Sequence, residues 1–203
     1  MKQTKIITIK QQEAFAADFP LFRYPNRSLN EFSIEIESDG YIALVESILA
    51  QQLSAKVAKV VIDRFYQNTG FDPRFLATQS IEQIKAIGCT KNKAIAIQQL
   101  SQIINDNPTY FKQLHHYQHD KIIQQLVKLH QVGPWTAEMF MIFSMDRPDV
   151  LSFGDLIIKK GLAQLWNHPF DIDKAIALKQ ELANQATLAS LMIWEMMENP
   201  SPL

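Results

Sequence analysis

Proline placement constrains the fold of this chain more than any other feature of its sequence. The chain has nine prolines, and none lies within residues 26–72, 74–107 or 109–133. Apolar residues recur in these three gaps at the spacing of amphipathic helices. Six glycines among 203 residues are also few for an all-β chain, which needs many tight turns. The sequence therefore predicts an all-α fold of about ten short helices.

Polar residues mark the beginnings of several of these helices. Ser54, Ser80, Asp155 and Asp171 each precede an apolar segment and are expected to act as N-caps. The expected helices cover approximately residues 41–50, 54–65, 80–87, 91–105, 119–129, 134–145, 156–165, 171–183 and 188–194.

Two further expectations concern individual segments. The inner face of the second helix is expected to carry Val57, Val60, Val61 and Phe65. The first 40 residues are poorly patterned, apart from a short strand expected over Lys5–Ile9.

Charge and cysteine content exclude several classes of protein. Lysine and arginine number 20 against 21 acidic residues, so global basicity is excluded although a local basic face is not. One cysteine forms no internal disulfide, four-cysteine zinc site or iron–sulfur cluster. No apolar run approaches the roughly 20 residues that span a bilayer, and the N-terminal segment lacks a signal-peptide core. We expect an intracellular protein with no membrane partner.

The stretch Leu126–Gly161 carries the chemistry, and it begins as helix, four-residue turn and helix. The second helix starts at Gly133-Pro134-Trp135-Thr136. Backbone N–H groups at such an N-terminus can bind phosphate without a basic side chain. The simpler interpretation is an ordinary hairpin of two helices.

An aspartate follows about one long helix later, in Phe153-Gly154-Asp155-Leu156. A carboxylate at a helix N-terminus is held as an anion by the backbone amides and the helix dipole. Such an anion suits a reaction that develops positive charge at a sugar carbon. The simpler interpretation is a plain N-cap.

Four motifs resemble the helix-hairpin-helix base-excision DNA glycosylases, most closely their 3-methyladenine DNA glycosylase II branch. They are ILAQQLSAKVAKVV (48–61), AIGCTKNKAIAI (86–97), VGPWTAEMFMIF (132–143) and RPDVLSFGDLIIKKG (147–161). The resemblance covers about residues 40–165 and implies two helical lobes flanking a cleft. Residues 1–203 then form a single glycosylase domain: residues 1–40 and 165–203 pack as one lobe, and 41–165 carry the core helices, hairpin and catalytic loop.

The resemblance implies a role for each motif residue. Asp155 stabilises the sugar cation and helps to align water. Trp135 lines the base pocket with Gln51 and Met139, although Trp135 could instead belong to the core. Gln52 aligns with the wedge that fills the stack after base flipping, Leu53 is the more natural plug chemically, and a plain polar turn is the alternative. The expected DNA contacts are Gln52, Leu53, Val132, Gly133, Pro134, Thr136, Lys91 and Lys93. Main-chain carbonyls of Val127, Leu129 and Val132 are implied to hold a monovalent cation, K⁺ or Na⁺; no cofactor is required.

Three departures from the family pattern affect these expectations. Gln131 replaces the usual first glycine of the hairpin, so its tip is distorted if that position needs a positive φ. Trp135 occupies the position of the lysine found in the strand-cleaving branch. Residues 184–187, Asn-Gln-Ala-Thr, replace a run that usually supplies an arginine.

The expected function is that of a monofunctional DNA glycosylase that removes alkylated purines such as 3-methyladenine from double-stranded DNA. Two alternatives remain: a helix-hairpin-helix DNA-binding module that has lost catalysis, and a glycosylase for another lesion such as uracil or hypoxanthine. We expect a cytoplasmic monomer that works with the DNA, in the nucleoid if the protein is bacterial.

Overall fold

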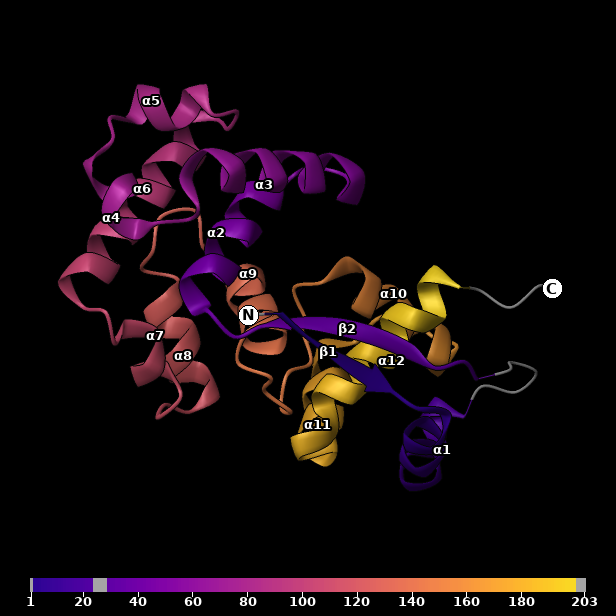
Figure 1. The fold of residues 1–203 in the computed structure, drawn as a ribbon. Helices are drawn as coiled ribbons and strands as arrows, with labels where there is room; N and C mark the ends of the chain where they lie inside the picture. The colour runs from indigo at the N-terminus through magenta and orange to yellow at the C-terminus, as the bar shows by residue number, and fades with distance from the viewer. Residues whose placement is uncertain (1, 24–28, 200–203) are drawn as a thin grey trace. The chain divides into compact units, whose positions relative to one another are not determined.

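Helices make up most of the computed structural model, which describes residues 2–23 and 29–199 (Figure 1). The elements of the first part of the chain are β1 (Lys2–Ile7), α1 (Ile9–Asp18), the 3-10 helix η1 (Pro20–Phe22), β2 (Phe32–Glu37), α2 (Gly40–Ala50), α3 (Ala55–Thr69), α4 (Pro73–Thr78), α5 (Ile81–Ala86) and α6 (Lys91–Asp106). Those that follow are α7 (Tyr110–Leu114), α8 (His119–Leu126), α9 (Pro134–Phe143), α10 (Leu156–Trp166), α11 (Ile172–Leu182), the 3-10 helix η2 (Ala183–Gln185) and α12 (Ala186–Glu198). Strands β1 and β2 pair in one small sheet. The predicted helical class is confirmed.

The chain divides into two compact units. Unit 1 spans residues 37–140, and unit 2 combines residues 2–36 with the chain from residue 141 onward. Unit 2 is thus built from two segments that are far apart in the sequence. The compact units divide near residues 36 and 140. The single glycosylase domain with a lobe boundary near residue 165 stays a prediction.

Unit 1 is organised around α6, which packs against α2, α4 and α5. Its fully buried side chains include Leu44, Leu49, Leu76, Ile84 and Ile97. They come from four different helices, and together they form part of the interior of unit 1.

The inner face of α3 agrees with the prediction in part. Phe65 is buried as predicted, whereas Val57 and Val60 are 47% and 52% exposed and Ala58 is buried in their place. Both sets satisfy helical spacing, so the pattern alone could not decide which stripe faces inward. Thr69 also lies on the buried stripe and donates its hydroxyl to the Phe65 carbonyl at 2.8 Å.

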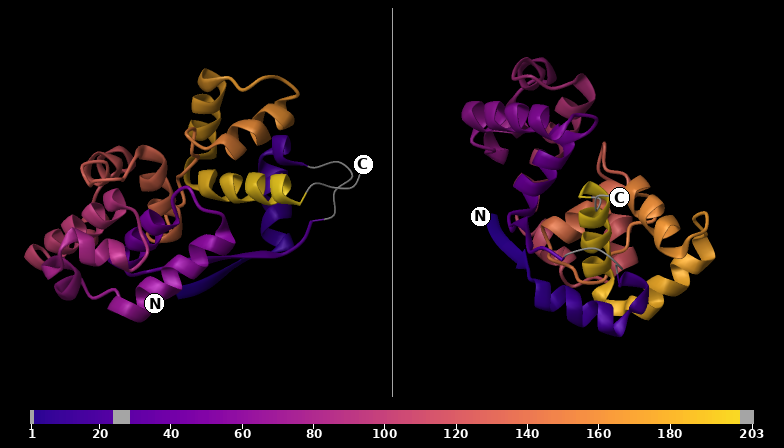
Figure 2. Two further views of the ribbon diagram at one scale, coloured as in Figure 1. Left: turned by 90° about the horizontal axis from the view of Figure 1, so that it is seen from above. Right: turned by 90° about the vertical axis from the view of Figure 1, so that its right-hand side faces the viewer.

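Unit 2 has its own apolar core, in which α10 packs along α12 (Figure 2). Gly161 permits this close approach, because a Cβ there would overlap the Ile193 side chain. Phe15 and Phe22 from the N-terminal segment complete the core, with ring centroids 4.9 Å apart. The two distant segments of the chain therefore share one interior.

The N-terminal segment is more ordered than its sequence pattern suggested. The expected strand is present but spans Lys2–Ile7, and both α1 and β2 were missed. The sequence nevertheless carries a local signal for each of these two elements. Thr8 and Gln11 form a capping box at the beginning of α1, and β2 has the alternating sequence FSIEIE.

Most predicted helix beginnings are confirmed. Ser54, Ser80, Asp155 and Asp171 each accept a backbone N–H in the first turn of α3, α5, α10 and α11, respectively. Over the two described ranges of the chain, every helix is too short or too polar to cross a bilayer.

Candidate active site

The hairpin of unit 1 connects α8 to α9 through the residues around Gln131. Gln131 has φ +64°, the left-handed conformation usually taken by glycine, so glutamine keeps the turn that its position requires. The Val132 N–H donates to the Leu129 carbonyl at 3.2 Å and closes this turn. Val132 is itself buried and anchors the turn in the core. The hairpin tip is therefore not distorted, because Gln131 itself adopts the left-handed conformation.

The tip beyond this turn is open. The helical hydrogen-bond ladder of α9 begins with Ala137 N–H donating to the Gly133 carbonyl at 3.0 Å, so the Gly133 and Thr136 N–H groups precede it. Pro134 is the first helical residue, and it brings no N–H group. A Cβ added at Gly133 would have no atom within 4 Å. An anion could approach this backbone closely.

A second turn in unit 1, between α2 and α3, carries the residues expected to enter DNA. Gln52 is also left-handed, with φ +60°, and is exposed. Leu53, the next residue, is 38% exposed. Gln51 lies half-buried beside them, and its Nε2 donates to the Gln131 carbonyl at 2.8 Å. The side chain of Gln51 thereby joins this turn to the hairpin.

A cavity of about 900 Å³ opens between the two turns of unit 1. Its walls bring together six of the residues predicted for the site: Gln51, Gln52, Leu53, Lys93, Trp135 and Thr136. Trp135 is 43% exposed, so it is not a core tryptophan. The cavity is therefore bordered by an accessible aromatic ring and several side-chain amides, groups that can stack on and hydrogen-bond to a nucleobase.

The remaining predicted residues of unit 1 lie in different settings. Lys91 is exposed in the first turn of α6, while Met139 is half-buried on α9. Lys93 is buried, and its ammonium donates to the carbonyls of Leu49 and Gln51, both at 2.8 Å. Burial lowers the pKa of Lys93. Lys93 thus holds the end of α2 and the following turn instead of extending toward solvent.

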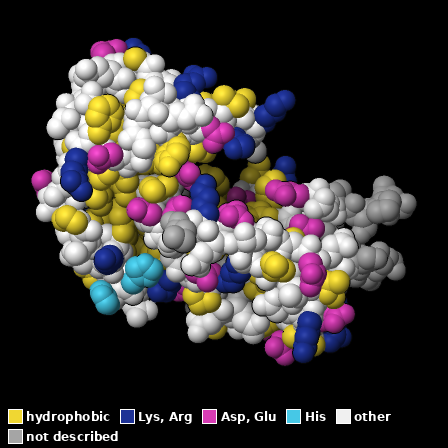
Figure 3. Space-filling model, viewed as in Figure 1, with side chains coloured by type: hydrophobic (Ala, Val, Ile, Leu, Met, Phe, Trp, Pro, Cys, Tyr) yellow, Lys and Arg dark blue, Asp and Glu magenta, His cyan; other side chains and the backbone are white. Residues whose placement is uncertain are grey.

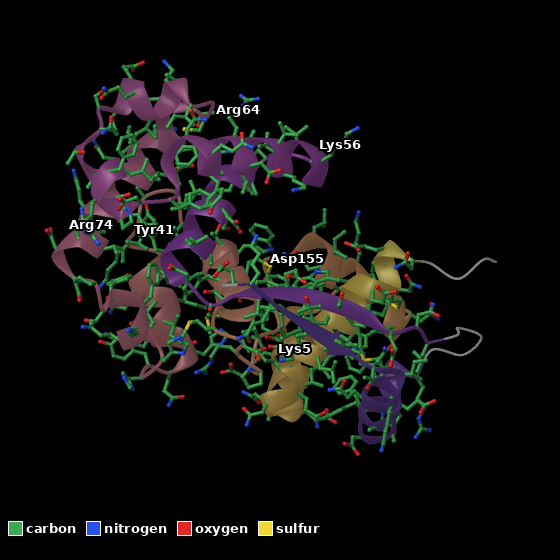
Figure 4. The ribbon with its side chains drawn as sticks, viewed as in Figure 1. Lys5, Tyr41, Lys56, Arg64, Arg74 and Asp155 are labelled. Carbon is green, nitrogen blue, oxygen red and sulfur yellow. The ribbon has the colours of Figure 1, made fainter. Side chains whose placement is uncertain are left out.

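In unit 2, Asp155 caps α10 and is almost fully buried (Figure 4). Its Oδ1 accepts the backbone N–H of Ile157 at 2.7 Å and of Ile158 at 3.0 Å. The indole Nε1 of Trp194 reaches the same oxygen at 3.5 Å. Three donors therefore converge on one carboxylate oxygen, which fixes the orientation of the group.

Trp194 was missed as a site residue by sequence reasoning. It lies in the helix expected over residues 188–194, and an indole that reaches Asp155 from 39 residues away leaves no local pattern in the sequence. Its ring also stacks on Phe143, with centroids 5.9 Å apart and planes inclined by 22°. The aspartate therefore has an aromatic neighbour that is itself held in place.

The loop that leads to Asp155 is pinned by α12. The Thr187 hydroxyl accepts the Val150 N–H at 3.0 Å and donates to the Arg147 carbonyl at 2.6 Å. The Ser190 hydroxyl donates to the Val150 carbonyl at 2.8 Å. Thr187 is one of the residues that replace the family's arginine-bearing run, and here its hydroxyl group holds the loop before Asp155.

Basic side chains do not form a broad positive face on the surface seen in Figure 3, where blue and magenta groups are interspersed. Lys59, one of the lysines of α3, pairs with Asp63 at 2.9 Å. Lys56 extends from the first turn of the same helix (Figure 4). In unit 2, the Lys159 Nζ lies 5.7 Å from the centre of the Phe170 ring. Lys159 thus lies near Phe170, in the segment between α10 and α11.

Comparison with known proteins places these features in a family. Residues 45–185 match the model of the HhH-GPD superfamily of base excision DNA repair proteins. This match covers well over half of the chain, and the chain belongs to that superfamily.

Individual relatives agree with this assignment. DNA-3-methyladenine glycosylase 1 of Schizosaccharomyces pombe is 27% identical over 179 residues, which cover 84% of this chain and 75% of that protein. The DNA-3-methyladenine glycosylase of Saccharomyces cerevisiae is 23% identical over 184 residues, and the match spans 62% of its length.

Solved structures share the fold. A crystal structure of a DNA-3-methyladenine glycosidase from Bacillus halodurans superposes with a TM-score of 0.80 at 29% identity, covering 95% of this chain and 92% of that one. The Schizosaccharomyces pombe 3-methyladenine DNA glycosylase in complex with abasic DNA gives a TM-score of 0.67 at 22% identity, with 92% of each chain covered.

Proposed function

We propose that this protein is a monofunctional DNA glycosylase that hydrolyses the N-glycosidic bond of alkylated purines, such as 3-methyladenine, in double-stranded DNA. The observation that carries the proposal is the arrangement at Asp155, where three donors orient one buried carboxylate. The relatives named as 3-methyladenine glycosylases support the choice of lesion. The damaged nucleotide is flipped out of the helix before it reacts.

The chemistry needs one anion and no strong general acid. Alkylation has already made the purine cationic, so the bond between C1′ and the base nitrogen breaks with its electron pair moving to the base, which leaves neutral. The sugar becomes an oxocarbenium-like cation, which the Asp155 carboxylate stabilises electrostatically. The oxygen of water then forms a bond to C1′ and releases its proton. Trp135 offers an electron-rich face to the cationic base.

The products are free base and an intact strand with an abasic site. Strand-cleaving relatives attack C1′ with an amine and form a Schiff base. Trp135 stands where that lysine would lie, and the sequence has no lysine between Lys128 and Lys159. Lys159 lies against Phe170, which supports the absence of an amine at the reaction centre.

A monovalent cation is proposed at the hairpin, held by the main-chain carbonyls of Val127, Leu129 and Val132. Neutral carbonyl oxygens suit K⁺ or Na⁺. The left-handed Gln131 preserves the glycine-like turn among these residues, and the Leu129 carbonyl accepts one hydrogen bond there, which leaves a second lone pair. A bound cation would add positive charge next to the phosphate that the hairpin N–H groups contact.

One experiment tests the function. Purified protein is incubated with duplexes that contain 3-methyladenine, uracil, hypoxanthine or no lesion, with borohydride present in a parallel set. We expect release of the alkylated base, an uncut strand and no trapped adduct. Release of uracil or hypoxanthine alone would assign another lesion, and binding without release of any base would indicate a DNA-binding module. An adduct that disappears on mutation of Lys159 or Lys160 would overturn the monofunctional assignment.

A further inference from the structure

The turn between α2 and α3 is held on two sides by the side chains of Lys93 and Gln51. From α6, the buried Lys93 ammonium holds the carbonyls of Leu49 and Gln51. Toward the hairpin, the Gln51 amide holds the carbonyl of Gln131 at 2.8 Å and lies 3.5 Å from the Thr136 hydroxyl. Gln51 is thus bonded through its backbone to α6 and through its side chain to the hairpin.

These bonds surround two residues in an unfavourable backbone conformation. Gln52 and Gln131 both have positive φ. This conformation costs free energy for any residue that has a side chain, so it persists only where the surrounding structure imposes it. Gln51 precedes the first of them and bonds to the carbonyl of the second. One backbone bond also braces the turn, from the Leu53 N–H to the Ala50 carbonyl at 3.1 Å. Without the Gln51 and Lys93 contacts, Gln52 and Leu53 could relax into other conformations.

We propose that Gln51 and Lys93 are positioning residues for base flipping, which hold the exposed Gln52–Leu53 turn ready to enter the duplex. This inference rests on the proposed function. The Gln51 amide also makes the turn and the hairpin one unit, so that the element that grips the backbone and the element that enters the stack are held in register. Without the Gln51 amide, the turn must become ordered as it enters the duplex. The free-energy cost of this ordering weakens only the complex in which the nucleotide is flipped.

The test separates binding of flipped DNA from binding of ordinary duplex. Gln51→Met keeps the length of the side chain and removes the amide. Affinity is measured for an undamaged duplex and for the same duplex with a tetrahydrofuran abasic-site analogue. We expect unchanged affinity for undamaged DNA and an affinity for the abasic duplex lower by about threefold to tenfold, the range for one neutral hydrogen bond. Lys93→Met should produce the same split.

A matched control is available on α6. Gln98 donates its Nε2 to the Gln79 carbonyl at 2.5 Å, so Gln98→Met removes a bond of the same kind in the same unit. It should lower thermal stability like Gln51→Met and leave both affinities unchanged. A fall of both affinities in parallel in Gln51→Met would mean a merely structural role and would overturn the proposal.

A double-mutant cycle identifies the residue through which Gln51 acts. If Gln51 works by holding the turn, its effect on abasic binding disappears in a background of Gln52→Ala with Leu53→Ala. A full additional loss in that background would mean that Gln51 contacts DNA itself, against the proposal. Wild-type protein that binds abasic and undamaged duplexes equally would also overturn it. These measurements need no base release, so failure of the proposed activity is recognised separately.

Discussion

Replacing Asp155 with asparagine separates its cap from its charge. The Ile157 and Ile158 N–H groups and the Trp194 indole all reach Oδ1 of Asp155, an atom that asparagine retains as a carbonyl oxygen. Asn and Asp are nearly equal as N-caps. The folded state therefore loses chiefly the interaction of the negative charge with the helix dipole, about 0.3–1 kcal/mol. For a chain of this length, we expect the melting temperature to fall by no more than about 2–4 °C.

Catalysis should respond far more strongly than stability. A preorganised group that meets developing charge in a transition state contributes about 2.7–4 kcal/mol, or a factor of about 100–1000 in rate. We expect Asp155→Asn to slow base release under single-turnover conditions by that factor. The assay uses excess enzyme and a duplex containing one 3-methyladenine, together with thermal denaturation followed by circular dichroism.

Asp171 offers a matched control in the same unit. It caps α11 by accepting the Lys174 N–H at 3.0 Å, so Asp171→Asn makes the same chemical change at another helix of unit 2. Its melting temperature should change as little as that of Asp155→Asn, and its rate should be that of the wild type. A wild-type rate in Asp155→Asn, or an equal loss of rate in both variants, would refute the assignment of Asp155 to the chemical step.

Three other predictions concern binding and reactivity. Gly133→Ala adds a methyl group where nothing lies within 4 Å, so folding should be unaffected, while affinity for duplex DNA falls about tenfold if a phosphate approaches that backbone; unchanged affinity would remove the hairpin tip from the interface. Affinity for DNA should depend only weakly on salt. A plot of log K against log salt concentration has a slope of about −0.9 for each phosphate neutralised by a basic side chain, and backbone N–H groups neutralise none; a steep slope would mean that lysines and arginines hold the DNA. Partial burial raises the pKa of Cys89 to about 11, so iodoacetamide should label it slowly at pH 8 and faster as the pH approaches 11; fast labelling at pH 8 in the folded protein would contradict this raised pKa.

Helix beginnings were predictable because they depend on local chemistry. Ser54, Ser80 and Asp155 each bond to the backbone within the next three residues, so the sequence alone contains both partners. The same locality should have revealed α1, since Thr8 and Gln11 form its capping box within four residues. The sequence therefore contained the signal for α1, and the prediction overlooked it.

The contacts that complete the site were beyond local reasoning. Gln51 meets Gln131 across 80 residues, and Trp194 meets Asp155 across 39. Neither pair is marked by spacing or periodicity, because the folded chain alone brings its members together. Lys93 illustrates the same limit: the sequence suggests a solvated lysine near a turn, whereas the folded chain buries it and bonds its ammonium to one carbonyl of α2 and one of the following turn.

Unit 2 is built from two distant segments of the chain, and this determines the order in which the two units can fold during synthesis. Its core joins residues 2–36 to the chain after residue 140, so the N-terminal segment must wait for partners that the ribosome makes much later. At about 5–20 residues per second, the roughly 60 residues between the end of unit 1 and the end of α12 take about 3–12 seconds to make. Unit 1 is continuous in sequence and can fold during that delay. The contacts of Trp194 with Asp155 and of Thr187 with the preceding loop form only after α12 has been made, so a nascent chain can complete the hairpin of unit 1 before the surroundings of Asp155 are complete.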